Sequence, residues 1–529
     1  MGGTILKSQY EIISKLSNRN SAILLLSLVF GGILMRLYFT PFHIPLSLDA
    51  IDYFAYAVAI NREGIFPTGY LFSNFGLSTF LSITFLDSNN FEMIELMNIQ
   101  RIFTILISSF TAIPIYLLSK NFFQREIAIL SASLFIFDPR IIENSVLGIT
   151  DSLFIFFTVM TILFIFYKEK KFVYLSFVFA VLASFVRYEG LLLIFPVIIS
   201  QIILHNKIKQ FKFKFSLGVF LCLVILIPLN FIGYEETGKT AIFSQVLGGG
   251  NYVSQIIIQG EPDSDDEYFG PGVENKIQVF LSNTIQGLGT YLVWILIPVF
   301  VIFSLLGIIF IPKKITKNKI VFGSFFVFVI IASVYAYGRG IQDTRYLLVI
   351  LPLFSILTGY GFKILAKVEL KKLILITIFS IVLVSSIFIE IKNQDFIFEK
   401  EIFEATRFLI NNAQGVNDYT GNKYVKVAEL QRVWPDLLPK NVDGKMGFQI
   451  KKFPTKDFDN LIEYINFNKN EGLSHLVIVE NERELFLNKI FHNEKDYEFL
   501  KKIYDSKDLG FKNQIKIFEI NYNDFNLKR

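Results

Sequence analysis

The sequence predicts a mainly α-helical, polytopic membrane protein with about eleven transmembrane helices, followed by a soluble α/β domain. Three observations lead to this prediction. Hydrophobic residues make up 53% of the 529-residue chain, which contains 59 phenylalanines, more apolar side chain than the core of a soluble protein of this length needs. Long apolar stretches alternate with short loops, and every second loop is basic. Near residue 393 the composition changes to that of an ordinary soluble domain.

Eleven stretches are apolar enough to lie in lipid, and several approach the roughly 20 residues that a helix needs to cross a bilayer. They are residues 21–40, 102–119, 127–139, 152–167, 172–186, 190–204, 215–233, 288–311, 320–337, 346–362 and 373–391. Residues 71–86 are also apolar, but Ser73, Asn74 and Gly76 interrupt them. Counting 71–86 as a span would reverse the sidedness of every later loop, so we expect a re-entrant or interfacial element there.

Basic residues in alternate loops set the expected orientation. These loops carry Lys120 and Arg125, then Lys168, Lys170 and Lys171, then Lys207, Lys209, Lys212 and Lys214, then Lys313, Lys314, Lys317 and Lys319, and finally Lys363, Lys367, Lys371 and Lys372. Because short basic loops stay in the cytoplasm, we predict a multi-pass protein of the cell membrane with a cytoplasmic N-terminus and a first span that is a retained signal anchor. Topogenic charge then accounts for the net charge of +5 without a nucleic-acid partner.

The change in composition divides the chain into a membrane domain, residues 1–392, and an extracytoplasmic α/β domain, residues 393–529. The second domain is charged, and its patterns predict amphipathic helices at 399–411 and 457–468, a strand at 475–480 and a further helix after it. Roughly 135 residues suffice for an independent core. Its sequence has no recognisable nucleophile, metal cluster or phosphate loop, so we expect it to recognise an acceptor or to pack over a catalytic cavity.

The first outer loop contains two carboxylates, Asp49 and Asp52, followed by Tyr53 and Tyr56. In a helix these four residues fall at i, i+3, i+4 and i+7 and share one face. Two carboxylates placed in this way can take a proton from an acceptor hydroxyl or bind a divalent cation beside a phosphate. A solvated amphipathic helix whose acidic residues cap its start is the alternative interpretation.

Other charged residues converge on the outer ends of the predicted spans. They are Arg101, Asp138, Arg140, Glu143, Asp151, Arg187, Glu189, Arg339, Asp343 and Arg345. Charged groups at this depth are costly and are by default candidates for function, and arginine suits a phosphate because it stays charged and donates two parallel hydrogen bonds. Structural ion pairs, Arg187 with Glu189 or Arg345 with Asp343, are the alternative for each residue alone. Their gathering on one side favours a shared site.

Several of these segments together resemble the GT-C glycosyltransferases. The segments are Asp49-Ala-Ile-Asp52-Tyr53-Phe-Ala-Tyr56, Arg101-Ile-Phe-Thr, Phe137-Asp138-Pro139, Gly148-Ile-Thr-Asp151, Val186-Arg187-Tyr188-Glu189-Gly190 and Thr344-Arg345-Tyr346-Leu347. The resemblance covers roughly residues 20–390 and is nearest to the branch of protein O-mannosyltransferases, aminoarabinose transferases and rhizobial galacturonosyltransferases. It implies an inverting hexosyl- or pentosyltransferase of the cell envelope, which moves a sugar from a dolichyl or undecaprenyl phosphate carrier to a lipid, glycan or protein acceptor outside the cytoplasm.

The resemblance also implies roles for individual residues. Asp49 or Asp52 would be the catalytic base or the acid of a Mg²⁺ or Mn²⁺ site, and the sequence does not decide between them. The GT-C loop often has adjacent Asp and Glu, whereas Ala50 follows Asp49 and Tyr53 follows Asp52, which leaves the metal requirement open. The carrier phosphate, which is the leaving group, would be held by Arg101, Arg187 or Arg345. Asp151 would orient the acceptor or an arginine, and Asp138, Glu189, Arg339 and Asp343 complete the expected substrate-binding set.

Two further hypotheses come from the rest of the chain. Asp263 and Asp265 form an Asp-x-Asp in the long outer loop, a spacing with which nucleotide-sugar enzymes hold a metal, although a solvated run or a mobile lid is the alternative. The other function to weigh is a transporter or flippase of a lipid-linked saccharide, which mid-membrane charges and internal symmetry would favour. An oligosaccharyltransferase is disfavoured because the tryptophans, Trp294 and Trp434, form no Trp-Trp-Asp motif.

Overall fold

The computed structural model describes most of the helical part of the chain and much of the C-terminal part. The described residues are 18–46, 49–63, 74–85, 93–167, 172–206, 210–231, 247, 276–365, 370–392, 400–405, 408, 453, 455, 458–480, 485–512 and 514–527. The chain divides into two compact units. The first comprises Met1–Thr40, Phe66–Thr84 and Asn98–Asn393, and the second comprises Pro41–Ile65, Phe85–Met97 and Gln394–Arg529. The second unit thus takes in two stretches of the predicted first outer loop.

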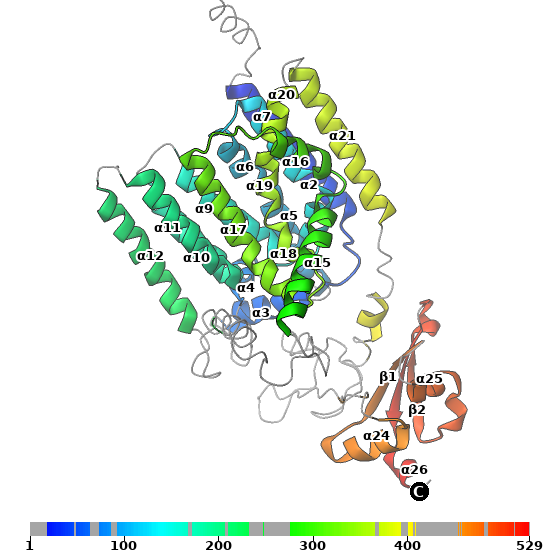
Figure 1. Cartoon of the computed structure of the whole chain (residues 1–529). Coiled ribbons are helices and arrows are strands. Elements are labelled where there is room, and N and C mark those ends of the chain that lie inside the picture. Colours follow the sequence, from blue (N-terminus) through cyan, green and yellow to red (C-terminus); the bar gives the residue numbers. More distant parts are fainter. Residues whose placement is uncertain are drawn as a thin grey trace, which may run out of the picture. The chain divides into compact units, whose positions relative to one another are not determined.

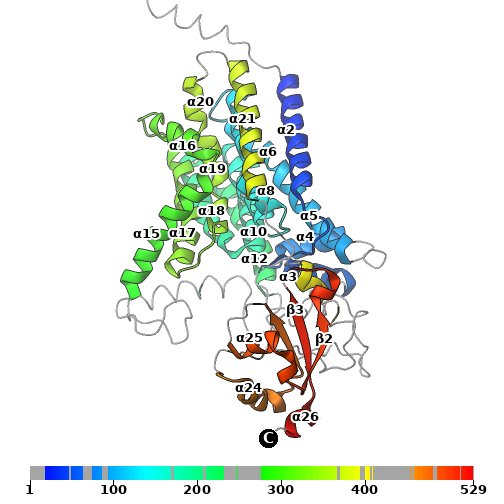
Figure 2. The same ribbon diagram turned by 90° about the vertical axis from the view of Figure 1, so that its right-hand side faces the viewer.

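The first unit is built of helices that run side by side (Figures 1 and 2). Its helices are α2 (Asn18–Phe39), α4 (Gly76–Thr84), α5 (Met93–Phe110, which begins in the second unit), α6 (Ala112–Ser119), α7 (Arg125–Ile136), α8 (Pro139–Ser145), α9 (Asp151–Phe166), α10 (Leu175–Val186), η3 (Tyr188–Leu193), α11 (Ile194–Ser200), η4 (Gln201–His205), α12 (Phe211–Phe231), α15 (Lys276–Leu296), α16 (Phe300–Ile309), α17 (Lys317–Gly338), α18 (Arg345–Leu348), α19 (Leu351–Leu357), α20 (Gly359–Leu365) and α21 (Leu370–Ile391). Helix α10 packs against both α9 and α12, and α17 packs against α15.

The outside of this unit is apolar. Large side chains such as Leu26, Phe30 and Phe220 are exposed on it, an arrangement that suits lipid rather than water. Among the described residues, eight helices are long and apolar enough to cross a bilayer: Arg19–Phe39, Ile94–Ser119, Tyr188–His205, Phe211–Phe231, Ile277–Leu296, Lys317–Gly338, Arg345–Ile364 and Ile374–Ile391. The protein is therefore a membrane protein, as predicted.

All eleven predicted spans coincide with helices, but three of those helices are short. Helices α7, α9 and α10 have 12, 16 and 12 residues. Helices α7 and α9 are buried along almost their whole length, so contact with lipid does not set how long they must be. The predicted span 288–311 begins earlier than expected, because α15 starts at Lys276, and it is split at Pro298, which has no backbone N–H to continue a helix.

The apolar stretch 71–86 does not form a transmembrane helix in the part that the structure describes. Helix α4 has nine residues, about 14 Å at 1.5 Å per residue, which is half the thickness of the hydrocarbon core. It packs against α10. Gly76 makes this packing close, since a Cβ there would lie 2.6 Å from the carbonyl oxygen of Phe185. Its short length is compatible with the expected re-entrant or interfacial element, which stays a prediction.

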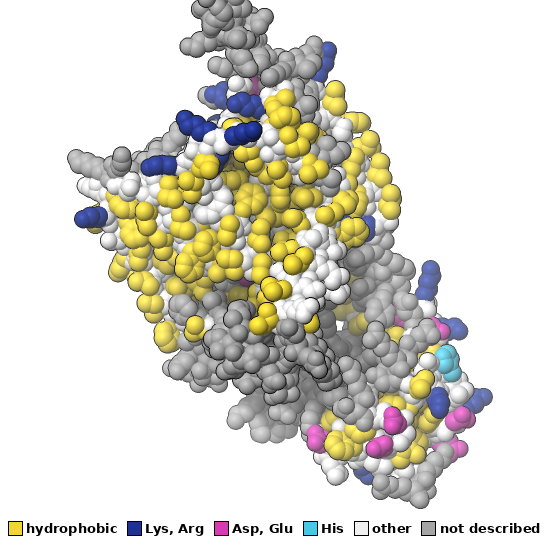
Figure 3. Space-filling model, in the orientation of Figure 1, with side chains coloured by type: hydrophobic (Ala, Val, Ile, Leu, Met, Phe, Trp, Pro, Cys, Tyr) yellow, Lys and Arg dark blue, Asp and Glu magenta, His cyan; other side chains and the backbone are white. Residues whose placement is uncertain are grey.

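Lysine and arginine side chains gather at one end of the helical unit (Figure 3). This end holds the junctions between α6 and α7, α11 and α12, α16 and α17, and α20 and α21. Described basic residues at these junctions are Lys120, Arg125, Lys212, Lys214, Lys313, Lys314, Lys317, Lys319, Lys363 and Lys372. The four junctions fall in predicted cytoplasmic loops, so the charge pattern of the sequence corresponds to one end of the fold.

A buried arginine ties α2 to its neighbours. Arg36 is fully buried, and its Nε donates to Ser145 Oγ at 3.0 Å, its Nη1 to the carbonyl oxygen of Ile136 at 2.8 Å, and its Nη2 to Ser108 Oγ at 3.2 Å. Gly32, one turn earlier, lets α2 approach Ile136, whose Cγ1 would lie 2.5 Å from a Cβ at that position. Arg36 therefore joins four separate helical segments through hydrogen bonds.

Replacing Arg36 by methionine is expected to destabilise the helical unit by about 2–4 kcal/mol. The substitution keeps the length of the side chain but leaves buried hydroxyl and carbonyl groups without their donor. Thermal unfolding of the purified protein in lipid nanodiscs measures the effect, with Arg19→Met, at the exposed start of α2, as the matched control. An unchanged unfolding temperature for the Arg36 variant would show that these hydrogen bonds do not hold α2 in place.

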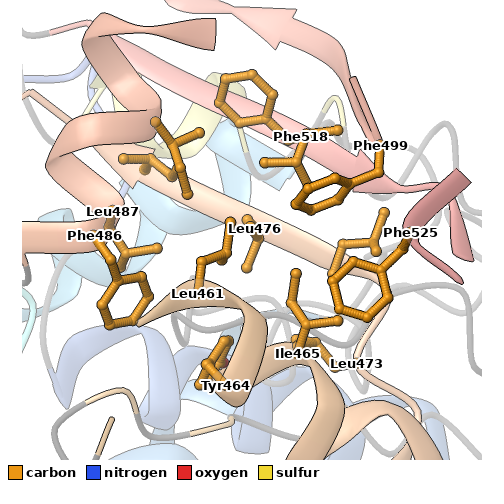
Figure 4. Close-up of a cluster of buried hydrophobic side chains, with 14 of the residues drawn as sticks. Leu461, Tyr464, Ile465, Leu473, Leu476, Phe486, Leu487, Phe499, Phe518 and Phe525 are labelled. Atoms are coloured by element: carbon orange, nitrogen blue, oxygen red, sulfur yellow. The ribbon is translucent and has the colours of Figure 1, made fainter. Parts of the chain in front are cut away.

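The second unit contains a three-stranded antiparallel sheet with the order β1-β3-β2. The strands are β1 (His475–Val479), β2 (Leu500–Asp505) and β3 (Ile515–Ile520), and the helices near them are α24 (Leu461–Asn468), α25 (Leu485–His492) and α26 (Tyr522–Leu527). Leu476 pairs with Phe518 and Leu500 with Ile520 across the sheet. Apolar side chains from α24, α25, α26 and the strands form one core (Figure 4).

The elements predicted for this unit are largely present. The helix expected at 457–468 is α24, the strand expected at 475–480 is β1, and α25 is the helix expected after it. Of the helix expected at 399–411, residues 400–405 are helical, while 399, 406–407 and 409–411 lie outside the described residues. The second unit also contains α3 (Asp49–Glu63).

Candidate active site

A charged pocket opens in the helical unit where α9, η3, α17 and α18 meet. The cavity is small, with a volume of about 20 Å³. The charged side chains that line it are Asp151, Arg187, Glu189 and Arg345, and the aromatic ones include Phe154, Phe328 and Tyr346. The structure thus brings together four of the charged residues that the sequence singled out.

Arg187 is the centre of this pocket. Its Nη1 donates to Asp151 Oδ1 at 2.7 Å and its Nη2 to Glu189 Oε1 at 2.8 Å. Asp151 is fixed from its other side, because Asn144 Nδ2 donates to its Oδ2 at 3.2 Å. The guanidinium also lies 5.8 Å from the ring of Phe154 and 5.6 Å from that of Tyr346. Carboxylates and ring faces together hold a positive charge away from bulk water.

The local chain path explains why these groups meet. Arg187 ends α10 in an extended conformation, with φ −146° and ψ 130°, and η3 begins immediately after it. Gly190 lies so close to the end of α10 that a Cβ would be 2.3 Å from the nitrogen of Ser184. This tight return places Arg187 and Glu189 on the same side, while Asp151 opens α9, where the helix dipole favours a carboxylate.

Replacing Gly190 by alanine is expected to disturb the Arg187–Glu189 pair and to lower thermal stability by several degrees. The added methyl group meets backbone atoms that cannot rotate away, so η3 has to shift. Thermal unfolding measures the loss, and Gly289→Ala is the matched control because a Cβ at that glycine meets nothing within 4 Å. Equal stability for both variants would contradict this account of the turn.

A second arginine of the pocket is held by its own chain neighbour. Arg345 Nε donates to Asp343 Oδ2 at 2.6 Å, and its backbone N–H donates to Asp343 Oδ1 at 2.8 Å. Tyr337 Oη donates to the carbonyl oxygen of Asp343 at 3.0 Å. Both alternatives considered for these residues therefore apply: Arg187 and Arg345 are in ion pairs with nearby acids, and they also share one pocket.

Five other candidates lie elsewhere in the helical unit. Asp138 is fully buried and caps α8, where its Oδ1 accepts from the backbone N–H groups of Arg140 and Ile141 at 3.0 and 3.1 Å. Arg101 is buried on α5 and donates to Asn98 Oδ1 at 2.8 Å. Neither of these two side chains lines the charged pocket.

The remaining three candidates, Arg339, Glu143 and Arg140, contact neighbouring side chains. Arg339 Nη1 donates to Tyr335 Oη at 3.2 Å. Glu143 Oε2 lies 3.5 Å from Arg140 Nη1 and 2.8 Å from Lys392 Nζ. Arg140 also lies against the rings of Trp294 and Phe388, at 5.1 and 4.7 Å. These contacts join α8 to α15 and α21.

The two carboxylates of the first outer loop occupy the first turn of α3, in the second unit. The predicted helix is present, but the amphipathic pattern is not: Tyr53 and Tyr56 are buried, and so are Ile51, Ala55 and Val58 on the opposite face. Asp49 is exposed and Asp52 is half-buried. A solvated amphipathic helix therefore does not describe α3, since beyond its first turn it is buried on all sides up to Ala59.

The chain is similar in sequence to one protein family and in structure to several solved membrane proteins. The sequence model of the family described as dolichyl-phosphate-mannose-protein mannosyltransferase matches residues 96–231, which run from α5 to α12. A search of curated proteins gave no match. Among solved structures, the oligosaccharyltransferase of Archaeoglobus fulgidus, complexed with Zn and sulfate, is similar with a TM-score of 0.56 and 10% identity, over 85% of this chain and 67% of that one.

ArnT from Cupriavidus metallidurans, bound to undecaprenyl phosphate, is similar with a TM-score of 0.53 and 9% identity, over 95% of this chain and 98% of that one. The A. fulgidus oligosaccharyltransferase AglB, in complex with an inhibitory peptide and a dolichol-phosphate, gives a TM-score of 0.52 and 10% identity, over 86% and 69% of the two chains. The chain has the GT-C fold. The predicted resemblance is confirmed at the level of the fold.

The GT-C resemblance implies a Mg²⁺ or Mn²⁺ site, which the described residues do not complete. Within the described ranges there is no group of three or more His, Cys, Asp and Glu side chains placed to hold a metal. Asp151 and Glu189 instead each accept a hydrogen bond from Arg187. Asp263 and Asp265 lie outside the described residues.

Sequence reasoning missed three residues that shape this GT-C site. Asn144 holds Asp151, Tyr337 holds the carbonyl group of Asp343, and Arg36 binds Ser145 on the same short helix as Asn144. Arg36 had a signal, because it is a lone charge within an apolar span. Asn144 and Tyr337 had none, since neither residue type is unusual at the end of a membrane helix.

Proposed function

We propose that this protein is a membrane glycosyltransferase that transfers a sugar from a polyprenyl phosphate carrier, dolichyl or undecaprenyl, to a lipid, glycan or protein acceptor outside the cytoplasm. The observation that carries the proposal is the charged pocket in which Arg187 is held by Asp151 and Glu189, with Arg345 in its wall. The GT-C fold and the matched family, whose description names a dolichyl-phosphate-linked mannose donor, support it.

The carrier phosphate is the group that this pocket suits. The hydrogen bonds to Asp151 and Glu189 fix the plane and direction of the Arg187 guanidinium before a ligand arrives. In the proposed reaction the phosphate gains negative charge as it leaves the sugar. A preorganised arginine stabilises that developing charge, which is the electrostatic contribution that catalysis most needs.

The transfer is a single displacement with inversion. The oxygen of the acceptor hydroxyl forms a bond to the anomeric carbon of the sugar, the bond between that carbon and the phosphate oxygen breaks, and its electron pair stays on the phosphate. The hydroxyl proton passes to a carboxylate, for which Asp49 and Asp52 in the first turn of α3 are the candidates. Asp151 and Glu189 position Arg187 in this scheme, and Glu189 Oε2, which has no hydrogen-bond partner among the described residues, can accept from a ligand hydroxyl.

The sidedness follows from the distribution of charge. The charged pocket involves the first turn of α9, the residues after α10 and the start of α18, whereas the basic junctions lie at the opposite ends of α9, α17 and the neighbouring helices. The positive-inside rule places the basic ends in the cytoplasm. The pocket then opens outside the cytoplasm, where the second unit is also expected.

The proposal is tested with purified protein in nanodiscs and a panel of radiolabelled dolichyl- and undecaprenyl-phosphate sugars. The expected result is release of free polyprenyl phosphate together with transfer of label to an acceptor fraction of membrane lipid, glycan or peptide. Movement of intact lipid-linked sugar across the bilayer without cleavage would overturn the proposal in favour of the flippase.

A further inference from the structure

A second, uncharged pocket lies between α15 and the end of α17. Its cavity volume is about 170 Å³. Asn283, Gln286, Thr290 and Tyr291 line it from α15, and Tyr337 and Gln342 line it from the end of α17 and the turn that follows. Among the described residues, those that line it are all uncharged, unlike those of the pocket around Arg187.

The pocket is built by close packing. Gly287 lets α15 approach α17, because a Cβ there would lie 2.7 Å from the Cβ of Tyr337. The rings of Tyr291 and Tyr337 stack with centroids 5.0 Å apart and planes 29° apart. Gly340 then turns the chain with a φ of +80°, a conformation that glycine adopts without strain, and the next two residues return to the pocket wall.

The two pockets are connected through contacts between their lining residues. Tyr337 lines the uncharged pocket, and its hydroxyl group donates to Asp343, whose carboxylate holds Arg345 of the charged pocket. The ring of Tyr337 also lies edge-on to that of Tyr346, with centroids 6.5 Å apart, and Tyr346 lines the charged pocket. A change at Tyr337 can therefore affect both pockets, because this residue contacts Asp343 and Tyr346 as well as lining the uncharged pocket.

The lining indicates the chemistry of the occupant. Asparagine and glutamine amides both donate and accept hydrogen bonds, as does the hydroxyl of Thr290, and tyrosine rings offer apolar faces with a polar tip. A lipid tail would leave these amides without hydrogen-bond partners, which is costly, and the described lining offers no counter-ion to a charged group. A ring rich in neutral hydroxyl groups satisfies both the amides and the aromatic faces.

We propose that this pocket is a saccharide-binding subsite for an uncharged sugar unit. The inference rests on the proposed glycosyltransferase function and specifies its substrate class. The sugar comes either from the polyprenyl phosphate donor or from an acceptor glycan, since both present the same chemistry to the pocket. Uncharged sugars such as mannose and glucose are favoured over uronic acids and amino sugars, because a charged sugar finds no opposite charge in the lining.

The test uses the full-length protein in nanodiscs, free of maltoside detergents whose sugar head groups would compete. The variant is Gln286→Ala with Thr290→Ala, and the matched control is Ser282→Ala, an exposed position on the same helix outside the pocket lining. The probes are polyprenyl-phosphate mannose, polyprenyl-phosphate glucose, sugar-free polyprenyl phosphate and free mannobiose. Thermal unfolding of both variants shows that the fold is retained.

The expected result for a donor subsite is a loss of tenfold or more in affinity for the two sugar phosphates, with the sugar-free carrier and the control variant unchanged. For an acceptor subsite the loss appears with mannobiose instead. An equal loss for sugar-free and sugar-bearing carriers, or no loss with any probe, would overturn the subsite. Failure of the wild type to bind either form of the carrier would count against the proposed function. The subsite would then be decided by the mannobiose result alone.

Discussion

Replacing Arg187 by glutamine is expected to lower turnover of a polyprenyl-phosphate sugar by about 10²–10³-fold, the usual effect of removing one preorganised donor from a developing negative charge. Glutamine keeps hydrogen-bonding capacity but removes the positive charge from between Asp151 and Glu189. Because that charge acts on the leaving phosphate in the proposed reaction, the turnover number should fall more than the Michaelis constant rises. Initial rates of carrier release over a range of donor concentrations separate the two quantities.

The same substitution also leaves two buried carboxylates facing each other, so loss of activity could follow from loss of the fold. The double variant Arg187→Gln with Glu189→Gln removes one of them. Its unfolding temperature should recover toward that of the wild type while turnover stays low. Arg125→Gln, at the basic end of α7, is the matched single control and should keep full turnover. Recovery of turnover in the double variant would show that Arg187 has only a structural role.

Much of the fold follows from apolar length and charge. The positions of the long spans and the basic junctions were predictable because a bilayer imposes simple rules of length and sidedness. The lengths of α7, α9 and α10 were not, since helices surrounded by protein are shaped by packing rather than by lipid. The early start of α15 was missed because polar side chains such as Asn283 and Gln286, which line a pocket, look in the sequence like an outer loop.

The candidate site shows a similar division. Arg187, Glu189 and Asp151 were recognisable because charge at the end of a span is rare, and Arg187 and Glu189 are close in sequence. Arg345 lines the same pocket because α9, α17 and α18 pack together. No local sequence pattern predicts this packing. Tyr53 and Tyr56 illustrate the opposite failure: helical spacing placed them on a polar face, but both are buried, as are residues on the opposite face of α3.

The second large effect is expected at the first turn of α3. Changing Asp49 or Asp52 to asparagine keeps the size of the side chain and its place near the helix N-terminus but removes its ability to take a proton. If one of them is the general base, that variant should lose about 10²–10⁴-fold in transfer to the acceptor, while the other loses much less. Rates of label transfer with saturating donor measure both variants, with Asp459→Asn, an exposed carboxylate of the second unit, as the control.

The pattern of the losses also distinguishes a base from a metal ligand. If one aspartate is the base, only the substitution of that aspartate abolishes rapid transfer. The slow rate that remains then no longer depends on the protonation of a base. A metal site that uses both aspartates is damaged by either substitution, and EDTA then abolishes transfer by the wild type until Mg²⁺ or Mn²⁺ is restored. Full transfer by both variants, in the presence of EDTA, would exclude α3 from the chemistry. Glu189, whose Oε2 has no hydrogen-bond partner among the described residues and which lines the Arg187 pocket, would then be the carboxylate to test next.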